Sequence, residues 1–163
     1  MMYMIRRIMQ THAPAGNILI RVMVGSVFLS EGIQKFLFPA MLGPGRFEKI
    51  GFPDPAPLAY FVGSFETSCG LLVILGVLTR LTVIPLLCVI SMALLSTKAP
   101  ILLGRDFLWF HVGKASEYGF WAMVHEARTD FAMLMGGLYL LLTGGGSLSI
   151  DALLTRAHKG AEQ

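Results

Sequence analysis

A carboxylate inside a long apolar run is the feature that most constrains this chain. Glu66 lies in the middle of the run from Leu58 to Leu78. At about 1.5 Å per helical residue, a run of this length crosses a bilayer core of about 30 Å. An acid at such a position costs on the order of 2.5–3.5 kcal/mol, so it normally faces a bundle interior or a functional cavity. The sequence therefore predicts a membrane protein with a polar centre.

The composition supports a membrane protein. Hydrophobic residues make up 55% of the chain and charged residues 14%, whereas soluble domains average about 45–50% and about 25%. The 163 residues leave room for a single membrane domain, 1–163, and for no separate soluble domain. The formal charge of +3 comes from scattered basic residues. We therefore expect a lipid bilayer as the partner and no nucleic acid, which would require a clustered basic face.

Four apolar segments are each close to the length of a membrane span. Because lipid offers no hydrogen-bond partners to the backbone, these segments should be helices. The sequence predicts an all-α fold, an integral membrane four-helix bundle. The fourth span is short and could recruit residues upstream. The four spans cover approximately residues 15–38, 56–78, 81–97 and 130–144.

The connections differ in character. Prolines and glycines between residues 39 and 57 predict a rigid, non-helical loop. Thr79 and Arg80 are the only polar residues of a very short second connection, which predicts an antiparallel hairpin. Lys98 and Pro100 should close the third helix.

The third connection, Ile101–Thr129, is the longest and is rich in aromatic residues. Within it, we expect Phe107–Val124 to lie at the outer interface, as an interfacial helix or lid over the polar centre, and not to form a fifth span. The candidate lid residues are Trp109, His111, Tyr118 and Trp121.

The two termini should lie on one side of the membrane if there are four spans. Basic residues are almost balanced between the two sides, so the positive-inside rule decides little. We expect cytoplasmic termini, with Arg6 and Arg7 acting as an anchor and not as part of a cleaved signal.

The first span carries a stripe of glycine and charge on one helical face: Arg21, Gly25, Phe28, Gly32 and Lys35. Its glycines should allow a second backbone to approach closely. Glu31, one turn before Lys35, can pair with it. We expect Lys35 itself to extend to the interface, because a long basic side chain near a helix end usually reaches water.

Arg21 and Glu66 are predicted to contact each other. Counted from opposite ends of their spans, their backbones would differ in depth by only several ångströms, within reach of an arginine. The candidate binding centre thus comprises Arg21, Glu31, Lys35, Glu66 and Thr67. Such a pair could equally serve only to fix helix packing, and both interpretations remain open. No residue is assigned a catalytic role.

Other chemistry has little support in the sequence. Cys69 and Cys88 lie in different spans without a Cys-x-x-Cys pattern, so inert buried thiols are the simpler interpretation. His111 and His125 lack metal-ligand spacing, and no metal site is predicted. The phosphate-binding, nucleophile-elbow and dinucleotide motifs are absent from the sequence.

The chain resembles the DoxX family of small bacterial membrane proteins. The resemblance rests on the first-span stripe and on two further stretches, Phe47–Arg80 and Gly144–Leu154. It implies a multi-pass protein of the bacterial inner membrane with four spans. Family members are linked to quinone-coupled sulfur or respiratory oxidation and to assemblies that handle oxidative stress.

Three functions are consistent with this resemblance. The chain could be an accessory subunit of a membrane redox system with a quinone-head or proton site at the polar centre. It could instead be a small-molecule binder or transporter, or a structural assembly factor without catalysis. No cofactor is expected to be intrinsic, so a redox role would require a bound quinone or a partner subunit. The sequence does not indicate an oligomeric state.

Overall fold

The structure, a computed structural model, describes residues 14–160, with side chains up to residue 156. The described part is helical, and an isolated bridge between Phe107 and Phe110 is its only β feature. Arg6 and Arg7, the expected anchor, lie outside the described residues. The helices are α2 (Asn17–Leu37), α3 (Pro44–Ile50), α4 (Pro55–Leu75), α5 (Thr79–Ala93), η1 (Leu94–Lys98, a π-helix), α6 (Ala99–Leu103), α7 (Phe120–Thr143) and α8 (Ile150–Gly160).

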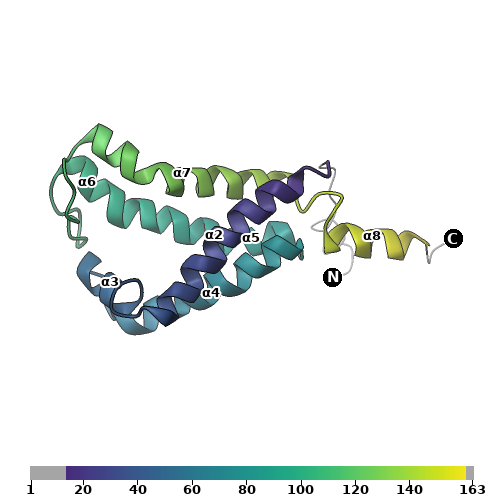
Figure 1. Ribbon diagram of the computed structural model, residues 1–163, viewed down its shortest axis with the longest axis horizontal. Coiled ribbons are helices and arrows are strands. Elements are labelled where there is room, and N and C mark those ends of the chain that lie inside the picture. Colours follow the sequence, from purple (N-terminus) through teal and green to yellow (C-terminus); the bar gives the residue numbers. More distant parts are fainter. Residues whose placement is uncertain (1–13, 161–163) are drawn as a thin grey trace.

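Two pairs of long helices make up the body (Figure 1). Helix α2 packs along α4, and α5 packs along α7; further contacts join α4 to α5 and α2 to α7. The short helices α3 and α6 lie at one end of the body, and α8 extends from the opposite end. Each pair is therefore an antiparallel arm; the two arms pack together towards the α8 end and diverge towards the end that carries α3 and α6 (Figure 1).

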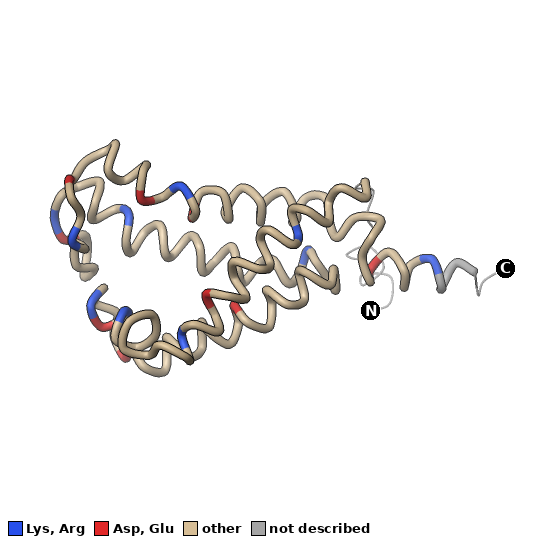
Figure 2. Tube along the Cα trace, viewed as in Figure 1, with Lys and Arg blue, Asp and Glu red and all other residues tan. Residues whose placement is uncertain are grey.

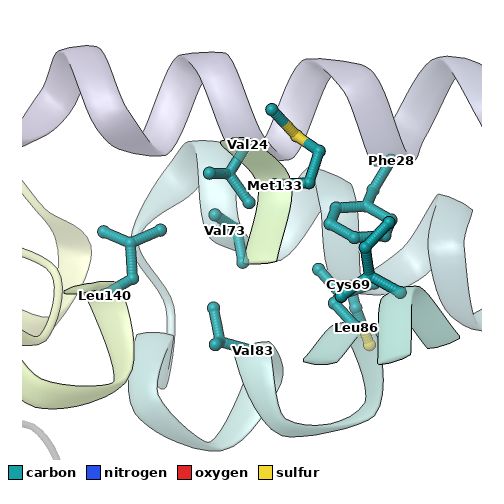
Figure 3. Close-up of a cluster of buried hydrophobic side chains, with 9 residues drawn as sticks. Val24, Phe28, Cys69, Val73, Val83, Leu86, Met133 and Leu140 are labelled. Atoms are coloured by element: carbon teal, nitrogen blue, oxygen red, sulfur yellow. The ribbon is translucent and has the colours of Figure 1, made fainter. Parts of the chain in front are cut away.

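A cluster of buried apolar side chains joins the arms (Figure 3). Every long helix contributes to it: Val24, Phe28, Cys69, Val73, Val83, Leu86, Ile90, Met133 and Leu140. Burying one such side chain stabilises a water-soluble fold by about 1.5–3 kcal/mol, but lipid removes most of that advantage. In a membrane, this cluster therefore stabilises the fold mainly through close packing of its side chains.

The predicted glycine stripe is where α2 and α4 approach most closely. A Cβ added at Gly25 would lie 2.7 Å from the carbonyl oxygen of Gly70, and one at Gly32 would lie 2.8 Å from that of Gly63. These distances are too short for any larger residue unless the backbone moves. Small residues at this spacing let two backbones pack directly, so the expected packing seam is confirmed.

Two helical segments are long and apolar enough to cross a membrane, Pro55–Leu75 and Thr79–Leu103. Helices α2 and α7 carry more charged residues than these two segments do. Those of α2 are Arg21, Glu31 and Lys35. Charged residues are sparse along the middle of the body and common near the connections by α3 and α6 (Figure 2).

Several predicted boundaries were wrong. The first connection contains a helix, α3, which Pro44 opens and Gly51 closes in the left-handed region. The third helix does not end at Lys98 but continues to Leu103. A five-residue π-helix precedes Pro100 there. Its i→i+5 hydrogen bonds connect the α-helical residues before it to those after it, so the helix continues past Lys98.

The fourth long helix begins at Phe120, about ten residues before the predicted span and in line with the expectation that upstream residues would join it. Trp121 accordingly belongs to the first turn of α7 and not to a separate lid. Residues 104–119 form an irregular loop, so no interfacial helix forms between α6 and α7. Thr79 and Arg80 also belong to a helix, the first turn of α5, and the hairpin turn is residues 76–78.

Candidate functional site

The buried polar centre between α2 and α4 is an ion pair of Lys35 and Glu66. Lys35 Nζ lies 2.5 Å from Glu66 Oε2, and the two side chains are only 8% and 6% exposed. The carboxylate makes no well-aligned hydrogen bond through Oε2, so the contact is mainly electrostatic. Because two charges out of water are costly unless paired, each residue depends on the other.

A third charge extends this centre towards the surface. Glu31 Oε2 lies 3.9 Å from Lys35 Nζ, as expected for residues one turn apart, and the Glu31 side chain is 45% exposed. Lys35 Nζ also donates to the backbone oxygen of Glu31 at 3.3 Å. Lysine therefore lies between a buried and a half-exposed carboxylate. We refer to Glu31, Lys35 and Glu66 as the acidic–basic triad.

Two predictions about these residues were wrong. Lys35 does not extend to the interface, because Glu66 holds its ammonium group inside the helix pair. Arg21 does not contact Glu66 but reaches the last turn of α4, at Val73 and Ile74. That turn is seven to eight residues beyond Glu66, or about 11 Å along the helix. The depth estimate failed because packing of Gly25 against Gly70 and of Gly32 against Gly63 sets how far α2 is shifted along α4, which residue counts do not give.

Arg21 instead binds the ends of two other segments. Its Nε donates to the oxygen of Val73 at 3.0 Å, and its Nη2 donates to the oxygen of Ile74. Its Nη1 donates to the oxygens of Gly145 and Leu148, at 2.9 and 2.6 Å. The last carbonyls of a helix lack partners and carry partial negative charge, so a buried guanidinium both satisfies and stabilises them. Arg21 is thus a structural residue that joins α2, α4 and the turn after α7.

Asp151 completes this junction, and sequence reasoning gave it no role. Its carboxylate accepts hydrogen bonds from the backbone N–H groups of Leu78 and Thr79, at 2.7 and 3.0 Å, and from the Thr79 hydroxyl at 3.2 Å. The side chain is 1% exposed. An acid at a helix N-terminus satisfies donors that have no helical partner. The signal was present in the sequence, because Asp151 is the one charged residue of the segment Ser147–Leu154.

Thr67 packs in the seam and not in the triad. A Cβ added at Gly32 would lie 2.5 Å from its hydroxyl oxygen, and that hydroxyl donates to Gly63 O at 2.8 Å. Thr67 also lines a shallow groove of about 330 Å³ with Ile33, Phe36, Leu37, Ser64 and Ser68. Of the predicted centre, the structure therefore groups Glu31, Lys35 and Glu66. Thr67 lies in the adjoining seam, and Arg21 lies apart from the triad, at the last turn of α4.

The candidate lid residues are dispersed. Trp109 and His111 lie in the loop beside the end of α3, where His111 N donates to Ile50 O at 2.8 Å. Tyr118 packs near Gly104, and its hydroxyl donates to Gly113 O at 3.3 Å. Trp121 is 80% exposed on α7.

A second ion pair joins the other arm. Lys98 Nζ at the end of η1 lies 3.2 Å from Asp130 Oδ2 of α7, and these side chains are 15% and 22% exposed. Cys69 is buried and Cys88 exposed, and both are free thiols. Among residues 14–156, no three His, Cys, Asp or Glu side chains are grouped so that they could hold a metal ion.

Comparisons with known proteins agree with the sequence resemblance. The DoxX family model matches residues 16–99. An uncharacterized membrane protein of Mycobacterium tuberculosis is 45% identical over 150 residues, covering 92% of this chain and 88% of that protein. A Bacillus subtilis protein with the name "Putative oxidoreductase CatD" is 27% identical over 145 residues, covering 88% of this chain and 90% of that protein.

No solved structure matches the chain. The family match covers the packing seam and the whole acidic–basic triad. The M. tuberculosis relative extends the similarity across nearly the full length. The chain is therefore a membrane protein that belongs to the DoxX family.

Proposed function

We propose that this chain is an accessory, quinone-associated subunit of a membrane redox system in the bacterial inner membrane. In this proposal α2, α4, α5–η1–α6 and α7 are four spans of one membrane bundle, with both termini in the cytoplasm. The observation that carries the proposal is the Lys35–Glu66 pair, because buried charges within a membrane are costly and usually mark a functional path.

The arrangement of the triad suits the handling of protons beside a redox carrier. Glu31 is half exposed, Lys35 is buried next to it, and Glu66 is buried behind Lys35. Carboxylates and amines in such a series can pass a proton from the surface to the interior. The name of the B. subtilis relative supports an oxidoreductase context for the family.

A bound quinone or a partner subunit would carry the electrons in this proposal. The triad offers a quinone a suitable group, since an ammonium can donate to a quinone oxygen once it is released from its carboxylate. The chain's own contribution would be to orient that oxygen and to supply or accept a proton through Lys35 and Glu31.

The proposal is tested by purifying the protein in mild detergent and quantifying copurifying quinone and proteins by mass spectrometry. We expect quinone to be retained by the wild type and lost in Glu66→Gln. Asp130→Asn, which breaks the ion pair of the other arm, is the matched control and should retain quinone. Wild-type protein without quinone but with ligand-dependent stabilisation would favour a binder or transporter. If cells that carry a variant with neutral residues at both Lys35 and Glu66 behave like the wild type, a structural assembly factor would be favoured.

A further inference from the structure

The loop between α6 and α7, residues 104–119, connects the two arms at the end where they diverge. It follows α6 in the arm of α5 and α7, yet it reaches α3, which belongs to the arm of α2 and α4 (Figure 1). The helices at this end stay within their own arms, because α3 packs on α4 whereas α6 packs on η1 and α7. In the part of the chain that the structure describes, this loop is therefore the main connection between the diverging ends. We call its residues 106–112 the strap.

The strap is attached to the end of α3 by a small set of contacts. His111 N donates to the last carbonyl oxygen of α3 at 2.8 Å. The Phe110 side chain is 1% exposed, and its ring centroid lies 5.0 Å from that of Phe52. Gly51, with a φ of +97°, permits this approach, because a Cβ there would collide with Trp109 O. The attachment thus depends on one backbone hydrogen bond and one buried ring.

The opposite end, near α8, is held more firmly. Arg21 donates to four carbonyl oxygens, which belong to α4 and to the turn after α7. The Asp151 carboxylate accepts three hydrogen bonds at the start of α5, from Leu78 N and from the N–H and hydroxyl of Thr79. Buried hydrogen bonds to charged groups are about twice as strong as those between neutral groups. A relative motion of the arms should therefore rotate about this junction, as in a hinge.

Glu31 of the triad faces the other arm at the diverging end. Ile20, Val24 and Glu31 lie on one face of α2, at spacings of four and seven residues. This face meets α7, because a Cβ added at Gly136 would lie 2.6 Å from Val24 and 3.8 Å from Ile20. Two turns further along, the same face carries Glu31, whose side chain is 45% exposed. The spacing of the arms therefore decides how large a molecule can reach this carboxylate.

We propose that the strap is a releasable latch and that the junction of Arg21 and Asp151 is the hinge of the two arms. While the strap is attached to α3, the arms keep one spacing. When it is released, the arms swing about the hinge, and larger molecules reach Glu31 from between them. The latch is a property of the fold and requires no quinone, so failure of the redox proposal would leave it standing.

Distances between spin labels on the two arms test the latch by double electron–electron resonance. The free thiols are removed by Cys69→Ala and Cys88→Ser. Phe61→Cys on α4 and Trp121→Cys on α7 then place labels at exposed positions of the diverging end. In Phe110→Ala, we expect this distance distribution to broaden and to extend by several ångströms, because the strap has lost its buried ring. A distribution as narrow as that of the protein with Phe110 would overturn the latch.

A second pair of labels and a second variant keep this test independent of folding. Leu75→Cys and Leu142→Cys are exposed positions at the α8 end, and their distance should not change. Broadening at both ends would overturn the assignment of the hinge. Gly51→Ala should release the strap by a different route, through the collision with the loop backbone, and should reproduce the broadening. Leu108→Ala, an exposed position within the strap, is the matched control and should leave both distances unchanged.

The rate of thiol labelling tests whether the latch controls access to the triad. Glu31→Cys in the same cysteine-free background is treated with N-ethylmaleimide and with a bulky polyethylene-glycol maleimide. In Phe110→Ala and in Gly51→Ala, we expect the rate for the bulky reagent to rise several-fold relative to that for the small one. Leu108→Ala should keep the original ratio. An unchanged ratio in Phe110→Ala would overturn the claim that the arms control access to Glu31.

Discussion

Lys35 of α2 and Glu66 of α4 form the buried ion pair of this membrane protein, with 2.5 Å between Nζ and Oε2. The pair lies beside the seam where Gly32 and Gly63 bring the two helices together. Both side chains are largely buried there, so each charge depends on its partner in the protein. The close packing of α2 on α4 at the seam therefore also places Lys35 and Glu66 next to each other.

Arg21→Gln should destabilise the protein markedly. A glutamine amide cannot replace the four carbonyl contacts that join α2 to α4 and to the turn after α7. Each hydrogen bond to a charged group contributes about 1.5–3 kcal/mol in proteins, so we expect a loss of several kcal/mol. Thermal unfolding in detergent measures this loss. Arg105→Gln, at an exposed loop position, is the control and should unfold like the wild type.

Gly70→Ala should weaken the packing of α2 on α4. The added Cβ would lie 2.6 Å from Leu29 N, and a backbone atom cannot move aside as a flexible side chain can. We expect a lower unfolding temperature and less ordered protein in detergent. Gly113→Ala, where the Cβ would meet nothing within 4 Å, should have no effect. An unchanged unfolding temperature in Gly70→Ala would show that the backbones of α2 and α4 can move apart without loss of stability.

The Asp106 contact should make the loop sensitive to acid. Hydrogen bonds from Val112 N and His111 hold the pKa of the Asp106 carboxyl below its ordinary value. A lowered folded-state pKa means that the contribution is complete above the ordinary pKa of about 4 and is lost as the pH falls through the lowered value. Trp109 emission in the Trp121→Phe background should therefore change below pH 4. The same titration of Asp106→Asn should lack that transition, and an identical curve would contradict the contact.

Reporter fusions test the proposed topology. Cytoplasmic termini predict active green fluorescent protein and inactive alkaline phosphatase when each is fused at either end. A phosphatase fused within residues 104–119 should be active, because this loop would face the periplasm. Phosphatase activity at both termini would reverse the orientation. Activity at one terminus only would contradict the four-span count.

The sequence predicted the helices and the seam better than the partners of its charges. Hydropathy located the long helices, and glycine spacing identified the face of α2 that contacts α4. Helix ends depend on local geometry that hydropathy does not encode, such as the π-helix before Pro100. The relative shift of α2 and α4 decides whether Arg21 or Lys35 reaches Glu66. That shift is set by packing at the glycines and so could not be obtained from residue counts.

The most direct test of the central claim is the double variant Lys35→Met/Glu66→Leu, measured for both unfolding temperature and retained quinone. Lys35→Met leaves the buried Glu66 carboxylate without its partner and should lose about 3–5 kcal/mol of stability, whereas Glu66→Leu leaves Lys35 with Glu31 and should lose less. The double variant removes both charges and should recover near wild-type stability. If the pair is functional, the recovered protein will contain no quinone. A stable double variant that retains wild-type quinone would show that Lys35 and Glu66 serve only to pack the helices.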